Sequence, residues 1–147
     1  MNIDEALLRQ KAEDGYTVCY IADCPHHNEC LRYLVGQHGQ TRSRVVMAVN
    51  PMNNEVQAGH CPMYRFAGKQ RMARGMTRML TLDMPGRVEK GIRQELFQYF
   101  GRTNYYEYRK GVRLISPEQQ QEIANIFQAY GWNEPPQFDD FVEDYAW

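Results

Sequence analysis

The clearest hydrophobic periodicity lies in the second half of the chain. Apolar residues recur about every four positions from Val88 to Phe100, which predicts an amphipathic helix over residues 87–100 that ends at Gly101. A short helix is predicted to follow over residues 103–109. These two elements would form part of a C-terminal helical bundle.

A third helix has a strong start signal at Ser116. The Ser116 hydroxyl can accept a hydrogen bond from a free N–H of the first turn, Pro117 suits the first helical position, and Gln119 can complete a capping box. Apolar residues then line one face as far as Tyr130, and Gly131 ends the helix.

Shorter patterns occur in the first half and middle of the chain. Amphipathic helices are predicted over residues 4–14 and 29–35. Residues 44–50 are rich in β-branched side chains and form the best predicted strand, with residues 63–66 as a second candidate. A stripe of methionines predicts a helix over residues 71–82, with the methionines filling the core.

Together these elements predict one mostly helical α+β domain spanning residues 1–147, with a small sheet around residues 45–49. A cysteine knuckle is expected in residues 1–66, a helical bundle in residues 67–131 and an acidic, aromatic tail in residues 132–147. The length of 147 residues suits a single domain, and 43% apolar residues suffice for a hydrophobic core.

The sequence predicts a cytoplasmic protein with no membrane partner. No apolar run approaches the roughly 20 residues that span a bilayer. The N-terminal residues lack the basic start and apolar stretch of a signal peptide. In a reducing compartment, cysteines are thiols or metal ligands rather than disulfides.

All four cysteines can be assigned to one metal site. Cys19, Cys24 and Cys30 are separated by four and five residues, and Cys61 is a distant fourth. Thiolates suit Zn²⁺, and four protein ligands would leave no open position, so the zinc would be structural. Clustered thiolates also hold iron–sulfur clusters.

Two alternatives to the four-cysteine zinc site stay open. The thiols can pack as small hydrophobic side chains, because free cysteine is among the most buried residue types. A neighbouring histidine can also replace one ligand; the candidates are His26, His27 and His60. An enzyme that uses His60 and Cys61 is the least favoured interpretation, since no third group stands out to orient the imidazole, and no catalytic residue is assigned.

The net charge of −1 hides a strong asymmetry. Residues 65–113 hold 12 basic and 4 acidic side chains, whereas residues 114–147 hold no lysine or arginine and 7 acidic side chains. Either these two parts neutralise each other within the fold, or the basic part offers a surface to a partner.

A basic segment rich in tyrosine runs from residue 102 to residue 113. Its guanidinium, amide and phenol groups suit nucleic acid, because arginine and lysine neutralise phosphates and Asn104 can recognise adenine. The predicted nucleic-acid-binding residues are Arg102, Thr103, Asn104, Tyr106, Arg109, Lys110 and Arg113. Alternatively, the tyrosines pack in the core and the basic groups form a solvated face or pair with the tail.

Aromatic residues alternate with acidic ones in the C-terminal tail. Phe138, Phe141, Tyr145 and Trp147 lie among four carboxylates. Because exposed aromatic residues at this density are unfavourable in water, we expect the tail to dock on its own domain with its acids toward the basic segment. A mobile tail would instead bind a partner or shield the basic segment from nucleic acid.

Residues 87–131 resemble part of a Cro-repressor-type helix-turn-helix. The resemblance rests on the order of a helix, Gly101, a short helix, a linker and a capped helix. It implies DNA as the partner. Two features depart from the pattern: Phe97 stands where the turn usually has a small residue, and the stretch after Gly101 is about two residues short.

Taken whole, the chain resembles a family of small bacterial proteins of unknown function. The residues that carry the resemblance are Cys24-Pro25, Cys30-Leu31-Arg32, Cys61-Pro62, Arg74-Gly75-Met76, Tyr105-Tyr106-x-Tyr108-Arg109-x-Gly111, Ser116-Pro117-x-x-Gln120, Gly131, Phe138-Asp139 and Tyr145-x-Trp147. The resemblance implies one intact domain and no assigned activity. The leading hypothesis is a nucleic-acid-binding or regulatory protein, followed by a protein-binding adaptor with a structural metal site and then by a Cys/His enzyme.

Overall fold

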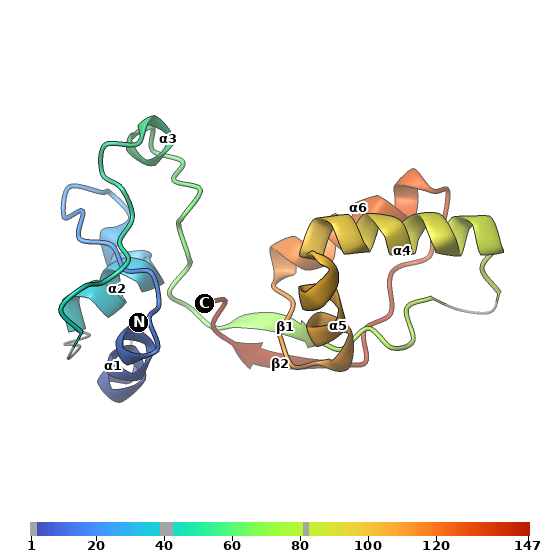
Figure 1. The fold of residues 1–147 in the computed structure, drawn as a ribbon, viewed down its shortest axis with the longest axis horizontal. Helices are drawn as coiled ribbons and strands as arrows, with labels where there is room; N and C mark the ends of the chain where they lie inside the picture. The colour runs from blue at the N-terminus through green and yellow to red at the C-terminus, as the bar shows by residue number, and fades with distance from the viewer. Residues whose placement is uncertain (1–2, 39–42, 81–82) are drawn as a thin grey trace. The chain divides into compact units, whose positions relative to one another are not determined.

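The computed structural model describes residues 3–38, 43–80 and 83–147 of the chain. Six α-helices, one short 3-10 helix and a two-stranded antiparallel sheet occur within these residues (Figure 1). The fold is therefore α+β and mostly helical, which confirms the predicted class. None of the described helices combines the length and apolar character needed to span a membrane.

The chain divides into two compact units, each with its own elements. The first unit comprises Met1–Gly68 and Trp147, and the second comprises Lys69–Ala146. The first contains α1 (Glu5–Glu13), the 3-10 helix η1 (His27–Glu29), α2 (Leu31–His38) and α3 (Asn54–Gln57). The second contains β1 (Gln70–Arg74), α4 (Gly86–Phe100), α5 (Arg102–Lys110), α6 (Pro117–Ala129) and β2 (Asp140–Asp144).

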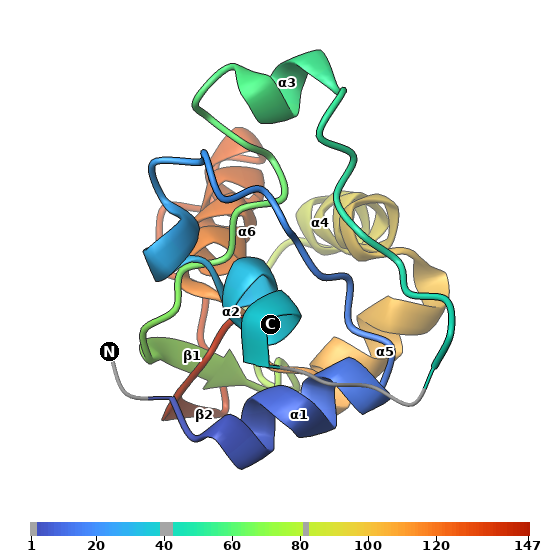
Figure 2. The ribbon, with the colours of Figure 1, turned by 90° about the vertical axis from the view of Figure 1, so that its left-hand side faces the viewer.

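The first unit has a small core where α1 packs against α2 (Figure 2). α1 begins at Asp4, whose carboxylate accepts a hydrogen bond from the N–H of Ala6 at 3.0 Å. The edge of the Trp147 ring covers Tyr16, with 5.6 Å between the ring centroids. The buried residues of this cluster are Leu8, Ala12, Val18 and Val35.

The strand predicted over residues 44–50 is wrong. This segment makes one isolated parallel bridge, in which Val18 pairs with Ala48, and Val45 and Met47 are 82% and 70% exposed. Residues 63–66 likewise contribute a single bridge, between Phe66 and Cys30. β-branched residues favour an extended backbone, but a strand forms only when a neighbouring segment pairs with it over several residues. Each of these two segments instead makes a single bridge.

The helix predicted over residues 71–82 is also wrong. Residues 70–74 form β1, which pairs antiparallel with β2 so that Met72 faces Val142 and Ala73 faces Phe141. The last two residues of the predicted helix, 81 and 82, lie outside the described residues. The tail therefore docks on its own unit, as predicted, and does so as a strand.

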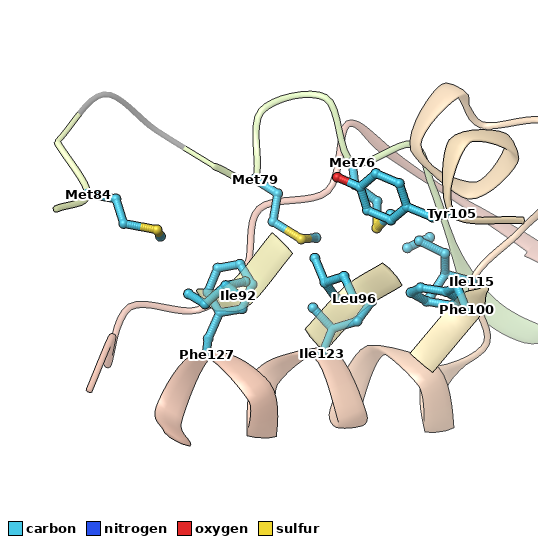
Figure 3. Packing of buried hydrophobic residues seen from close by; sticks show 11 residues of the cluster. Met76, Met79, Met84, Ile92, Leu96, Phe100, Tyr105, Ile115, Ile123 and Phe127 are labelled. Atoms are coloured by element: carbon cyan, nitrogen blue, oxygen red, sulfur yellow. The ribbon is translucent and has the colours of Figure 1, made fainter. Parts of the chain in front are cut away.

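The core of the second unit lies between α4, α6 and the segment that follows β1. Ile92 and Leu96 of α4 meet Ile123 and Phe127 of α6, and three methionines cover them from above: Met76, Met79 and Met84 (Figure 3). The methionines fill the core, as predicted. α6 has the predicted capping box between Ser116 and Gln119, and both predicted helices are confirmed.

Asp139 ties the tail to the turn that follows β1. Its carboxylate accepts hydrogen bonds from the Thr77 hydroxyl at 2.7 Å and the Thr77 N–H at 3.2 Å. Its backbone carbonyl accepts a hydrogen bond from the Arg78 guanidinium at 3.0 Å. Gly75 packs directly against the Asp139 side chain and has a φ of +83°. A Cβ at this position would come within 2.5 Å of the Asp139 carboxylate, so only glycine fits.

Burial by itself would raise the pKa of the Asp139 carboxyl. The hydrogen bonds from Thr77 and Arg78 favour the charged form and outweigh burial, so the pKa lies below its ordinary value of 3.8. A depressed pKa in the folded state means that the carboxylate stabilises the fold above its ordinary pKa, and that this contribution is lost as the pH falls.

We predict that Asp139→Ala lowers the free energy of unfolding by about 1–2 kcal/mol, because it leaves the Thr77 N–H without its acceptor. Urea unfolding at pH 7 measures the change. The matched control is Asp140→Ala, since Asp140 is exposed and adjacent, and we expect it to change stability by less than about 0.5 kcal/mol. Equal effects of the two substitutions would contradict the assigned role of Asp139.

We also predict a pH dependence for the same carboxylate. The difference in unfolding free energy between the wild-type protein and Asp139→Asn is expected to be constant above about pH 5 and to shrink as the pH falls below about 4. Urea unfolding of both proteins at several pH values between 3 and 7 tests this. A difference that persists unchanged at the lowest pH would show that the charge of Asp139 is unimportant.

Candidate functional site

The first unit contains a cavity of about 760 Å³ whose wall includes all four cysteines. The predicted metal ligands Cys19, Cys24, Cys30 and Cys61 all line this one cavity, although they are spread over more than forty positions of the sequence. Three histidines also line the cavity: His26, His27 and His60. The four cysteines are free thiols.

Two of the cysteines begin the same kind of turn. The His27 N–H donates to the Cys24 carbonyl at 3.1 Å, and the Tyr64 N–H donates to the Cys61 carbonyl at 3.1 Å. In each turn the cysteine is followed by proline, which presets the backbone for the second turn position. The repeated Cys-Pro pair in the sequence is the signal for this similarity, although two residues are too few to count as a repeat.

The other two cysteines are held by the segments around α2. Cys30 directly precedes α2 and is buried, and the Cys19 N–H donates to the Arg32 carbonyl at 2.9 Å. Burial raises the pKa of the Cys19 thiol, a hydrogen bond from the Ile21 backbone opposes this, and negative charge on the other three cysteines raises the pKa further.

The cysteines do not yet form a closed ligand shell. Among the described residues, no three side chains of His, Cys, Asp or Glu are arranged so that a single ion could be held. Metal binding would therefore require the thiols to turn inward from the wall. Their chemistry fits a thiophilic cation such as Zn²⁺.

His27 is oriented by a hydrogen bond to the backbone. Its Nδ1 lies 2.7 Å from the Cys24 carbonyl oxygen. Because a carbonyl only accepts, Nδ1 carries the proton, and the neutral ring keeps a lone pair on Nε2. This tautomer is the one found when histidine binds a metal through Nε2. His60 is exposed, and within the described part of the chain its ring makes no hydrogen bond to Cys61.

A buried arginine that the sequence analysis did not single out also lines the cavity. Arg32 is 8% exposed, and its guanidinium donates to the carbonyls of Met63 at 2.8 Å and Thr17 at 3.0 Å. It also lies over the Tyr16 ring, 4.9 Å from the centroid. Within the described residues it has no carboxylate partner. The one signal in the sequence for burial of Arg32 is its position between the apolar residues Leu31 and Val35 of α2.

The seven predicted nucleic-acid-binding residues are all exposed, and most lie on one face of α5. At about 100° per residue, Arg102, Tyr106, Arg109 and Lys110 share one side of the helix, with Thr103 at its edge. Asn104 lies about 160° away from Arg102 and Tyr106. Asn104 therefore cannot contact the same surface of a partner as Arg102 and Tyr106.

Tyr105 and Tyr108 belong to the core side of α5. Tyr105 is buried against Phe97, with ring centroids 4.5 Å apart. The Tyr108 hydroxyl accepts a hydrogen bond from the Gln119 amide at 3.3 Å. Tyr105 and Tyr108 therefore pack in the core, as the alternative interpretation of the basic segment predicted. Tyr106, in contrast, is 44% exposed.

The basic residues of the segment differ in their partners. Arg113 forms an ion pair with Glu107, in which its guanidinium donates a hydrogen bond to the carboxylate. This hydrogen bond raises the pKa of the Arg113 guanidinium. Among the described residues, Arg102, Arg109 and Lys110 form no ion pair. We name these three, with Tyr106 between them, the basic face of α5.

The acids of the tail lie against other arginines. In the β1–β2 pairing, Glu143 is opposite Arg71 and Asp140 is opposite Arg74. The Asp139 carboxylate lies 3.5 Å from the Arg78 guanidinium. The tail acids therefore lie opposite β1 and pair with the turn that follows it, and the basic face of α5 has no acidic partner among the described residues.

A small cavity of about 210 Å³ adjoins the basic face of α5. It is lined by Arg93 and Arg109, by the ring of Tyr105 and by Thr77. Burial raises the pKa of the Tyr105 hydroxyl, while the positive charges of Arg109 and Arg93 oppose that rise, so both guanidinium groups lie near the phenol. Most of the other lining residues are apolar, and Arg93 forms an ion pair with Glu89.

The helix connections differ from those of a helix-turn-helix. One residue, Gly101, separates α4 from α5, whereas six residues separate α5 from α6. The motif joins its two helices by a turn of about three or four residues. Ile115, in the longer connection, is held by backbone hydrogen bonds to Ala73 of β1. The resemblance to a Cro-type motif is therefore not supported by these connections.

Comparison with known proteins places the chain in a family. No match was found among curated proteins or among solved structures. A family model matches residues 1–147, and its description is a family of unknown function, DUF6078. The chain therefore belongs to the family of unknown function DUF6078.

Proposed function

We propose that this protein binds nucleic acid through the basic face of α5. The observation that carries the proposal is that Arg102, Arg109 and Lys110 are exposed on one side of a helix and form no ion pair within the described residues. Cations that are neither buried nor paired are available to phosphates. The acids of the tail, which would otherwise compete for them, lie against β1 and Arg78.

The spacing of the basic face suits a phosphate backbone. Arg102 and Arg109 are two helical turns apart, about 10 Å along the axis. Arg109 also lines the small cavity, where the neighbouring Arg93 is already paired with Glu89, so Arg109 is the cation that a phosphate would meet there. Tyr106 lies between the charges and can stack on a base or donate to a phosphate.

The proposed binding does not depend on sequence. Contacts to phosphates position a protein on nucleic acid but carry no sequence information. Asn104, the residue expected to recognise adenine, lies on another side of α5 from the basic face. The function proposed here is therefore general nucleic-acid binding rather than operator recognition.

A second candidate, a protein-binding adaptor, is favoured by one observation in the first unit. Val45, Met47 and Met52 are 82%, 70% and 77% exposed within one short stretch of chain. Clustered exposed apolar side chains mark interaction surfaces in many proteins. The acidic tail, the other surface considered for an adaptor, is engaged in β2.

We predict that the wild-type protein binds random-sequence DNA with an affinity that falls steeply with salt. Three phosphate contacts correspond to a slope of about −3 in a plot of log affinity against log salt concentration. Fluorescence anisotropy of a labelled duplex over a salt series measures this slope, and labelled single strands of DNA and RNA extend the test. Absence of binding at low salt would eliminate the nucleic-acid proposal and favour the adaptor.

Two arginines four residues apart provide a matched comparison. We predict that Arg109→Ala weakens binding and makes the salt slope shallower by about one, because it removes one phosphate contact. Arg113→Ala removes the same charge from a side chain that is already paired with Glu107, so its effect is expected to be smaller. If the two variants lose affinity equally, binding follows overall charge and not the basic face of α5.

We predict that Asn104→Ala leaves DNA affinity unchanged within twofold, for random duplexes and for adenine-rich duplexes alike. The reason is the position of Asn104, about 160° around α5 from Arg102 and Tyr106. The same anisotropy titration provides the measurement. A loss of affinity confined to adenine-rich DNA would show that a different side of the helix faces the bases.

A further inference from the structure

We propose that the cavity of the first unit binds one structural zinc ion through Cys19, Cys24, Cys30 and Cys61. This site is separate from the basic face of α5 and does not depend on nucleic-acid binding. The observation behind the proposal is that every cysteine of the chain lies on the wall of one cavity. Zn²⁺ is borderline-soft and takes four thiolates in a tetrahedron.

Packing as small hydrophobic side chains does not account for these thiols. Only Cys30 is buried, while Cys19, Cys24 and Cys61 are partly exposed on the cavity wall. The core of the first unit lies elsewhere, between α1 and α2, and contains none of the four. Because three of the four thiols fill no core position, a shared ligand explains their common place on one cavity wall better than packing does.

A buried positive charge on the cavity wall supplies an independent reason for an anionic centre. Arg32 is 8% exposed and has no carboxylate partner among the described residues. Buried charges are normally paired, because an unpaired charge loses its hydration without compensation. A zinc ion with four thiolates carries a net charge of −2, which would give the Arg32 guanidinium the negative partner that it otherwise lacks.

The first unit also has few other restraints. It contains no two-stranded ladder within the described residues, only the isolated bridges of Val18 with Ala48 and of Cys30 with Phe66. A metal ion that joins Cys19, Cys24 and Cys30 to Cys61 would close a loop of more than thirty residues. Small units with little core commonly gain stability from such a metal.

Binding requires the thiols to converge on one point. As described above, the side chains are not yet arranged around a single centre, but the cavity of about 760 Å³ leaves room for them to turn inward. Cys24 and Cys61 each begin a Cys-Pro turn, so rotation of their side chains needs no change in the backbone hydrogen bonds of those turns. The four thiols lose their protons to solvent when the ion binds.

The first experiment measures metal on the full-length wild-type protein, purified without chelator from zinc-supplemented cells. Elemental analysis is expected to find about one zinc per chain. Removal of the metal with a strong chelator is expected to lower the thermal midpoint and to change the fluorescence of Trp147, which packs on Tyr16 in the first unit. A Trp132→Phe background isolates that signal, because the chain has only two tryptophans.

Variants then identify the ligands. Cys61→Ser and Cys24→Ser are expected to lower the zinc content at least tenfold, whereas His60→Ala, which changes a cavity residue beside Cys61, retains the ion. Cobalt substitution provides a second readout: the wild-type protein should show thiolate-to-cobalt charge transfer and a tetrahedral spectrum. Arg32→Lys preserves the positive charge and should retain zinc, while Arg32→Met should weaken its retention against a chelator series.

Three results would overturn the proposal. The first is wild-type protein that contains less than about a tenth of an equivalent of zinc after supplementation and unfolds identically with and without chelator. The second is iron with inorganic sulfide in place of zinc, which would assign an iron–sulfur cluster to the cavity. The third is loss of zinc in His27→Asn with zinc retained in both Cys24→Ser and Cys61→Ser, all three variants being folded by circular dichroism. None of these results depends on DNA binding, and the first two need no variant.

Discussion

The second unit depends on the antiparallel pairing of β2 with β1. This pairing joins segments that are about seventy residues apart and brings the acids of the tail opposite the arginines of β1. The Asp139 carboxylate extends the contact to Thr77 and Arg78. On its other side, β1 bridges to Ile115 through Ala73, which fixes the connection between α5 and α6. A single pairing thus sets both the charge balance of the unit and the position of the helix that carries the basic face.

The separation of charges along the sequence has a specific structural outcome. The tail acids lie opposite the arginines of β1 and pair with Arg78 in the following turn, away from the cations of α5. Consequently, a unit that is close to neutral overall still presents three cations on one helix face that form no ion pair with any described residue. The local field around α5, rather than the net charge of −1, is what an approaching phosphate would encounter. The charge asymmetry between residues 65–113 and 114–147 therefore predicts an exposed basic surface only once the β1–β2 pairing is known.

Local signals in the sequence were sufficient for the helices and insufficient for the strands. α4 and α6 follow from apolar periodicity and from the capping box at Ser116, which depend on neighbours within four residues. β1 was predicted as the start of a helix because Met72, Met76 and Met79 recur at helical spacing, and the partner that makes it a strand lies in the tail. The cysteines were predicted as a group because their residue type is informative in itself. Arg32 was missed, since burial of an arginine depends on the carbonyls of Thr17 and Met63, which are distant in sequence.

The two unpaired groups of cations differ in what they require of their surroundings. Arg102, Arg109 and Lys110 are exposed, so water solvates them and the fold is stable whether or not a phosphate binds. Arg32 is buried, and a buried guanidinium without a counter-charge is unfavourable by several kcal/mol unless its environment compensates. Two backbone carbonyls and the Tyr16 ring provide part of that compensation. The anionic centre proposed for the adjacent cavity would provide the rest, so its loss should affect the stability of the first unit, whereas loss of a phosphate from the basic face should not.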